Sequence, residues 1–152
     1  MSARRESRTL AVQFLFQRDF NAGELDEALL QFWSDHRSSK KVREFAESLI
    51  RGVEAERALL DKQLQQCADH WDIHRMGGVD RNVMRVALFE MLHRSDIPPV
   101  VSINEAVELA KELSSDESGR FVNGILDRAR RELQRPAQAS GAETKSSASA
   151  AG

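Results

Sequence analysis

Arginine and aromatic residues that could bind nucleic acid lie together on one face of the first predicted helix. At about 100° per residue, Arg5, Val12 and Phe16 fall on the same face of a helix over residues 4–20, with Arg8 beside them. Guanidinium groups pair with phosphate, and an exposed ring offers a surface on which a base of a single strand stacks. The first 18 residues hold four arginines and one acidic residue, although the whole chain has a net charge of -2. The alternative, given equal weight, is that Phe16 packs under the second helix and that the arginines are only solvated.

A second edge of this kind is predicted at the start of the last helix, expected from about residue 116 to residue 133. Phe121 projects to the margin of the apolar stripe of this helix, whereas Arg120 lies on its polar side. Ser118 falls in the first turn, where unpaired backbone N–H groups suit a phosphate. The neighbouring Glu117 already complements the helix dipole, which argues against a strong anion site. The alternative, that Phe121 is an ordinary core residue, has at least equal weight on these residues alone.

No set of residues predicts catalysis. His70 and His74 have the i, i+4 spacing of metal ligands on one helical face, but no third ligand follows, so solvated surface histidines are the favoured interpretation. Cys67 lies on an apolar stripe between Leu64 and Trp71, which favours a small core residue over a reactive thiol. The chain lacks a phosphate-binding glycine loop, a dinucleotide-binding fingerprint and a nucleophile elbow. We therefore predict a protein that is not an enzyme and that needs no cofactor or metal.

The composition indicates a soluble globular protein of one domain. The 152 residues are 41% hydrophobic and 30% charged. The balance of 22 basic against 24 acidic residues excludes a protein that coats nucleic acid by bulk charge, but it allows a local basic site. We expect a cytoplasmic protein without membrane contact, because the single cysteine cannot form an internal disulfide and the chain shows neither a signal peptide nor a long apolar run.

Hydrophobic spacing predicts helices along the first half of the chain. A short second helix is expected over Leu25–Trp33, and a third apolar stripe runs from Val42 to Trp71. A break of this stripe between Gly52 and Arg57 is favoured over one continuous helix. Four residues of the first helix are expected to face the core: Leu10, Ala11, Phe14 and Leu15.

The glycine pair at residues 77–78 is expected to link this half to a second helical half. Asp80 is the expected N-cap of the next helix. Residues 96–99 predict a turn, and the two prolines and two valines at 98–101 are the most extended-looking piece of the chain. Ser102 and Glu105 have capping-box spacing and open a further helix. The predicted fold class is therefore all-α, a compact protein of two sub-bundles with three or four helices each.

The end of the chain differs in kind from the rest. Of the 17 residues from 136 to 152, 12 are Ala, Ser or Gly, so this segment carries nothing that builds a core. We predict one helical, RNA-binding domain over residues 1–135, followed by a disordered tail over residues 136–152.

Four motifs in order resemble those of the NusB family of transcription antitermination factors. They are AVQFLF at residues 11–16, VDRNVMRVALFEML at 79–92 with DIPP at 96–99, INEAVELAK at 103–111, and SGRFVNGILD at 118–127. The resemblance covers residues 4–134 and leaves out the tail.

This resemblance implies an all-helical protein without enzymatic activity. Members of the family bind boxA, a short single-stranded RNA element of ribosomal RNA leader transcripts, together with NusE, a ribosomal small-subunit protein. The joint complex assembles on RNA polymerase and helps it to read through terminators in ribosomal RNA operons. The alternative function is a helical protein-binding adaptor with little RNA affinity of its own.

Carried over to this sequence, the resemblance implies an RNA-binding surface on the first and last helices. Its residues are Arg4, Arg5, Arg8, Gln13, Phe16, Glu117, Ser118, Arg120 and Phe121. The candidates for a NusE-binding surface, on the second sub-bundle, are Asp80, Arg81, Met84 and Arg85. On the first helix, Val12, Phe16 and Phe20 are expected to form an exposed apolar strip, which serves either RNA or self-association into a homodimer.

Overall fold

Helices make up the regular structure of the described residues, 2–134, in this computed structural model, and no strand occurs among them. The elements are α1 (Ala3–Arg18), α2 (Leu25–Asp35), α3 (Lys40–Cys67), the short 3-10 turn η1 (Ile73–Arg75), α4 (Gly78–His93), α5 (Pro99–Leu113) and α6 (Asp116–Gln134). The all-α prediction is confirmed, whereas the predicted tail lies outside the described residues. None of the helices described here has the length and apolar character needed to cross a bilayer.

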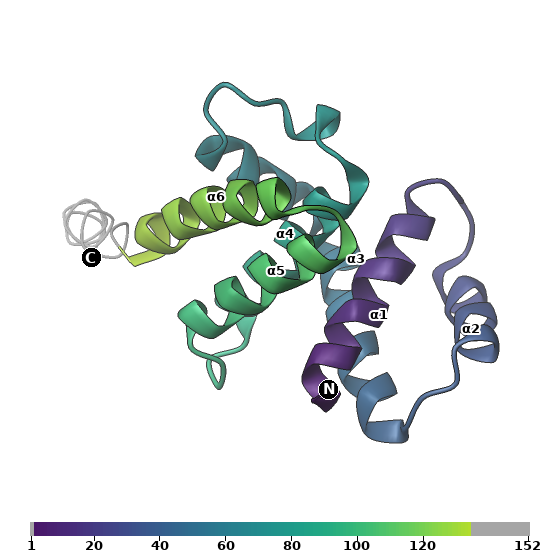
Figure 1. Ribbon diagram of the computed structural model, residues 1–152. Helices are drawn as coiled ribbons and strands as arrows, with labels where there is room; N and C mark the ends of the chain where they lie inside the picture. The colour runs from purple at the N-terminus through teal and green to yellow at the C-terminus, as the bar shows by residue number, and fades with distance from the viewer. Residues whose placement is uncertain (1, 135–152) are drawn as a thin grey trace, which may run out of the picture.

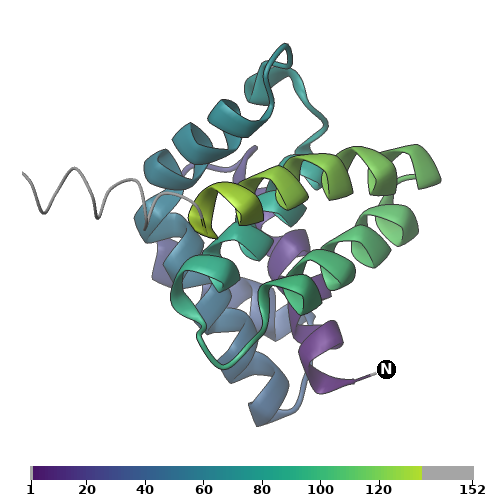
Figure 2. The same ribbon diagram turned by 90° about the vertical axis from the view of Figure 1, so that its left-hand side faces the viewer.

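The helices form two groups that share one core. In Figure 1, α1 and α2 lie on one side of the molecule, and α5 and α6 lie on the other. Figure 2 shows the pair α5 and α6 running side by side, in agreement with their extensive contact. Because α3 contacts α1, α4 and α6, it joins the two groups into one body. The predicted arrangement of two packed sub-bundles is therefore confirmed.

The long helix α3 bends where the sequence predicts a break. Glu56 has φ -115° and ψ 19°, outside the helical range, while the residues on both sides of it remain helical. One turn earlier, Gly52 allows α4 to approach closely, because a Cβ atom there would lie 2.1 Å from the ring of Phe89. The expected break between Gly52 and Arg57 is therefore a kink within one helix.

The predicted core is largely confirmed. The four α1 residues expected to face inward are buried, and so is Cys67. Trp71 is an exception, since 61% of it is exposed. The apolar stripe stops before this residue because α3 ends at Cys67 and Asp69 then takes a positive φ of 48°, which turns the chain out of the helix.

Two helix starts differ from the prediction. The N-cap of α4 is Gly77, whereas Asp80, the expected cap, lies within the first turn. Helix α5 begins at Pro99, so the segment expected to be extended is helical and Ser102 lies inside the helix rather than at its cap. A proline is compatible with the first position of a helix because the N–H that it lacks would have no intrahelical partner there.

A buried ion pair ties α1 to α4. Arg8 donates from Nε and Nη2 to the two carboxylate oxygens of Glu90, at 2.7 and 3.0 Å, and the side chains are 7% and 1% exposed. Ser102 of α5 donates a third hydrogen bond to Glu90 at 2.7 Å. The expectation that Arg8 lies at the surface beside Arg5 is wrong, because a carboxylate inside the core needs a counter-charge and Arg8 supplies it.

Replacement of Arg8 by methionine should strongly destabilise the protein. Arg8→Met keeps much of the side-chain volume but leaves the Glu90 carboxylate buried without its cation, so the free energy of unfolding should fall by about 3–5 kcal/mol. Equilibrium unfolding in urea measures this change. Lys40→Ala, which removes a long ion pair at the surface, is the control and should change stability by less than about 0.5 kcal/mol. Similar losses in both variants would show that the buried pair does not hold α1 against α4.

Candidate nucleic-acid interface

Arg4 and Arg5 lie at the surface near the start of α1, and acidic residues hold both of them. Arg4 donates from Nη2 to Asp96 at 3.2 Å. Arg5 donates from Nε and Nη2 to the two carboxylate oxygens of Glu105, at 3.0 and 2.7 Å. The two arginine side chains are 44% and 42% exposed. A phosphate group can therefore reach them, but it must compete with carboxylates that are already in place.

The carboxylates of this cluster stay ionised at neutral pH. Hydrogen bonds from Arg5 hold the pKa of Glu105 below its usual value. Those from Arg94 do the same for Asp96 and lower its pKa to about 2. Glu105 also lies 3.8 Å from Nη1 of Arg8. It thus connects the surface arginine to the buried ion pair.

Phe16 lies at the contact between α1 and α4. Its ring is half-buried against the start of α4, where a Cβ atom on Gly78 would lie 2.9 Å from it. The ring of Phe20 meets that of Phe16 edge-on, with centroids 5.3 Å apart, and Phe20 is 73% exposed. Gln13 is half-buried. Val12 is only 1% exposed, so the predicted apolar strip is wrong at that residue and consists of the two phenylalanines.

The start of α6 is divided between surface and contact residues. Glu117 and Arg120 are exposed, as the predicted interface requires. Ser118 is buried, and its hydroxyl group donates to Oδ2 of Asp80 at 3.1 Å. Its predicted place on an exposed RNA-binding surface is wrong, because the side chain belongs to the contact between α6 and α4.

The first turn of α4 joins the two predicted edges. Phe16 of α1 packs on Gly78, and Ser118 of α6 bonds to Asp80, two residues further along the same turn. Phe121 lies one turn after Ser118 and is half-buried, with its ring edge-on to an exposed tryptophan. The structure thus brings the aromatic parts of both edges to one end of α4. The arginines at the start of α1 lie elsewhere, since at about 1.5 Å per residue Arg5 is roughly 16 Å from Phe16 along α1.

The residues predicted to bind a partner protein mainly hold α4 in place. Met84 is fully buried. Arg85 is 3% exposed and donates to both oxygens of Asp61, at 2.7 and 2.8 Å. Arg81 donates to three backbone carbonyls of the segment before α4, two at 3.1 Å and one at 3.4 Å. The partner-surface prediction is wrong for Met84 and Arg85, because core packing and an internal ion pair occupy them, whereas Asp80 and Arg81 are partly exposed.

Sequence reasoning missed the two carboxylates that position the arginines of α1. The signal for Glu90 was its place in an otherwise apolar run, because an acid among core residues needs a cation. No comparable signal marks Glu105, since its capping-box spacing fits a helix start equally well. Its partner, Arg5, lies 100 residues away in the sequence.

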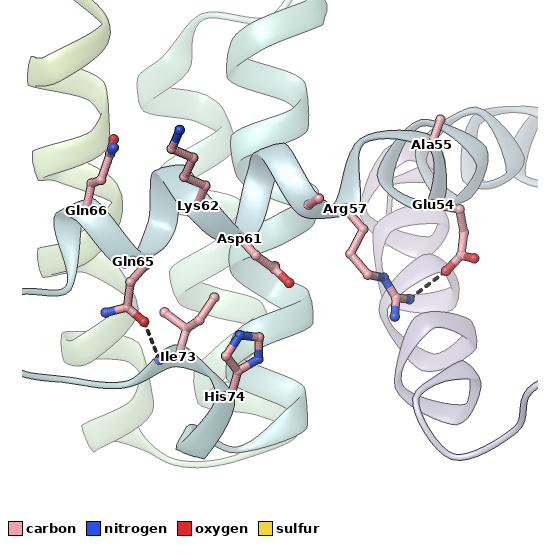
Figure 3. A pocket seen from close by; sticks show the side chains of 10 residues that line it. Glu54, Ala55, Arg57, Asp61, Lys62, Gln65, Gln66, Ile73 and His74 are labelled. Atoms are coloured by element: carbon pink, nitrogen blue, oxygen red, sulfur yellow. Dashed lines mark hydrogen bonds and ion pairs between the residues drawn. The ribbon is translucent and has the colours of Figure 1, made fainter.

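A cavity of about 840 Å³ lies along the second half of α3 and beside η1 (Figure 3). Some of its polar groups already have partners: Arg57 donates to Glu54 at 2.6 Å, and the backbone N–H of Ile73 donates to Gln65 at 3.1 Å. His74 lines the same cavity and is exposed. Within the described part of the chain, no three His, Cys, Asp or Glu side chains are placed to hold a metal ion.

Comparisons with known proteins agree on one family. The sequence profile of the NusB family matches residues 5–131. The transcription antitermination protein NusB of Desulfosudis oleivorans is 46% identical over 136 residues, with 88% of each chain covered. The solved structure of NusB from T. maritima has 38% identity and a TM-score of 0.78, over 85% of this chain and 91% of that one. A crystal structure of the antitermination factors NusB and NusE in complex with dsRNA shares the fold, with 22% identity and a TM-score of 0.78 over 87% of this chain and 98% of that one.

The family match spans all six helices of the described chain, from the first turn of α1 to the last turns of α6. The relatives are named for transcription antitermination and not for an enzymatic activity. This chain therefore belongs to the NusB family of non-enzymatic transcription antitermination factors.

Proposed function

We propose that this chain binds the single-stranded boxA element of ribosomal RNA leader transcripts together with NusE. The joint complex acts in the cytoplasm, where it assembles on RNA polymerase and helps it to read through terminators in ribosomal RNA operons. Family membership supports this function, as does the related structure of NusB and NusE with RNA. The observation in this chain that carries the proposal is the junction at the first turn of α4, which brings Phe16 of α1 and the start of α6 to one place.

The interface has few contacts to offer an RNA strand on its own. Arg4, Arg5 and Arg120 are exposed, so three phosphate contacts would give a log–log salt slope of roughly -2, at about 0.7 per contact. Stacking on Phe16 or Phe121 adds about 1–3 kcal/mol per base. Such a site binds weakly alone, and a partner that supplies further RNA contacts raises the affinity by linkage.

Two observations favour other uses of the same surface. Because acids already neutralise Arg4 and Arg5, a protein-binding adaptor with little RNA affinity is the second candidate. An electrophoretic shift of boxA RNA, with and without NusE, separates the two functions. The exposed ring of Phe20 beside Phe16 also supports self-association of the free protein, in competition with RNA.

Removal of the Arg5 guanidinium should weaken RNA binding without unfolding the protein. We expect Arg5→Ala to lower the affinity for boxA RNA and to make the salt slope shallower by about 0.7, because one phosphate contact is lost. Fluorescence anisotropy over a series of salt concentrations measures both. Arg51→Ala is the matched control, since Arg51 is 49% exposed and is likewise paired with an acid, Asp26, on another face. An unchanged slope in Arg5→Ala would exclude a phosphate contact at this residue.

Neutralising Glu105 should have the opposite effect. In Glu105→Gln the Arg5 guanidinium loses its competing carboxylate, so we expect boxA RNA to bind several-fold more tightly at low salt and with a steeper salt dependence. Asp26→Asn, which removes one of the two carboxylates paired with Arg51, should leave RNA binding unchanged. If Glu105→Gln binds more weakly than the unmodified protein, the carboxylate orients Arg5 for RNA instead of competing with it.

NusE and RNA should strengthen each other's binding by one common factor. This equality is required because the two binding equilibria share a single coupling free energy. Titration of NusE in the presence and absence of saturating boxA RNA measures the factor by which RNA raises the affinity for NusE. Titration of RNA with and without NusE measures the factor by which NusE raises the affinity for RNA. NusE affinity that does not change with RNA would contradict joint binding.

A further inference from the structure

A cavity beside Phe121 contains an aromatic side chain that the predicted RNA-binding set leaves out. The cavity has a volume of about 390 Å³ and lies between the segment before α4 and the first turns of α4 and α6. Trp71 and Phe121 both line it, with ring centroids 5.7 Å apart and ring planes at 82°. Trp71 is 61% exposed, so most of its ring surface is open to a ligand.

The segment around Trp71 is held in place although the ring itself is exposed. Gln65 of α3 donates from Nε2 to the carbonyl oxygen of Trp71 at 2.6 Å and accepts from the backbone N–H of Ile73 at 3.1 Å. Arg128 of α6 forms an ion pair with Asp69, two residues before the tryptophan. A large apolar ring presented to solvent by a fixed backbone is pre-organised for binding, because little ordering remains to be done when the ligand arrives.

Polar groups around the two rings suit a nucleotide. Asp80 lines the cavity, and its Oδ1 is shielded from solvent and has no hydrogen-bond partner among the described residues. A base that offers an N–H group would satisfy this oxygen. Arg75 also lines the cavity, and Arg120 precedes Phe121 on an exposed position. No carboxylate within residues 2–134 forms an ion pair with either arginine, in contrast to Arg4 and Arg5.

We propose that Trp71 and Phe121 hold one base of the bound RNA strand and that Asp80 reads its Watson–Crick edge by accepting a hydrogen bond from an amino group. This inference rests on the proposed function and adds to it a base-specific site on the segment before α4. Single-stranded RNA is read in this way when an unstacked base lies against aromatic rings while its edge meets polar groups. The unpaired cations beside the rings favour RNA over a protein as the ligand.

The two tryptophans of the chain provide a direct test. Trp33 is 7% exposed and Trp71 is 61% exposed, so Trp33→Phe leaves Trp71 as the only tryptophan, and Trp71→Phe leaves only the buried one. Trp33→Phe should fold, because it removes a buried Nε1–H that has no partner in the described structure. On titration with boxA RNA in the presence of NusE, the emission of Trp33→Phe should be quenched with the midpoint that anisotropy gives. The emission of Trp71→Phe should not change beyond any signal that NusE itself contributes to both variants.

Affinity and base preference complete the test. Trp71→Ala should weaken RNA binding on the order of tenfold. A single abasic substitution in the RNA should abolish the quenching and so identify the stacked position. At that position the protein should prefer cytosine to uracil on the order of tenfold, because a carboxylate accepts from the cytosine amino group, and Asp80→Ala, which has no acceptor there, should remove the preference.

The failures of the two proposals can be told apart. If anisotropy detects no RNA binding even with NusE, the proposed function and the base site are both excluded. If RNA binds but the emission of Trp33→Phe stays constant, or if quenching survives every abasic substitution, the base site alone is excluded. If NusE by itself produces the full change in Trp71 emission, the tryptophan contacts the partner protein and the base site is likewise excluded.

Discussion

The buried pair between Arg8 and Glu90 is the interaction on which the arrangement of α1 depends. Its charges meet in the core, with Ser102 of α5 as a third member, so one carboxylate fixes the positions of three helices. The same arginine approaches Glu105, which in turn holds Arg5 at the surface. The position of a surface cation is therefore set by a chain of contacts that begins in the core.

The first turn of α4 sets the positions of the aromatic residues, as the buried ion pair does for the surface arginine. Gly78 has no side chain where the Phe16 ring lies, and Asp80 receives the hydroxyl group of Ser118 from α6. Burial raises the pKa of Asp80, because this carboxylate lies partly out of reach of water. Two edges that are far apart in sequence thus meet at a single turn, and a change in the packing of α4 would displace both of them.

The sequence predicts helices well and the surroundings of individual side chains poorly, for a physical reason. Periodicity reports which face of a helix is apolar, so the core positions of α1 and the bend of α3 near Glu56 follow from it. It does not report which neighbour covers the remaining faces. Arg8 and Val12 share a face with Arg5 on a helical wheel, yet both are buried. For Arg8 the reason is that its partner, Glu90 of α4, lies 82 residues away in the sequence. For Trp71 the error is the opposite, because a residue predicted to be in the core is exposed. The apolar pattern continues in the sequence to Trp71, although α3 has already ended at Cys67.

The two ends of the candidate interface, at the start of α1 and around Trp71 and Phe121, differ in whether carboxylates pair with their arginines. We therefore expect the two ends to contribute differently to RNA binding. At the start of α1, each phosphate contact exchanges one ion pair for another, so its net gain is small and depends strongly on salt. Around Trp71 and Phe121, Arg75 and Arg120 have no carboxylate partner in the described structure, and stacking on the rings would depend on contact area, which salt does not screen. In the proposed complex, the aromatic end would therefore supply most of the affinity and the base selectivity, while the arginine end would align the strand. With a net charge of -2, a protein that works in this way would bind weakly to RNA that lacks the preferred base, because charge alone contributes little to its affinity.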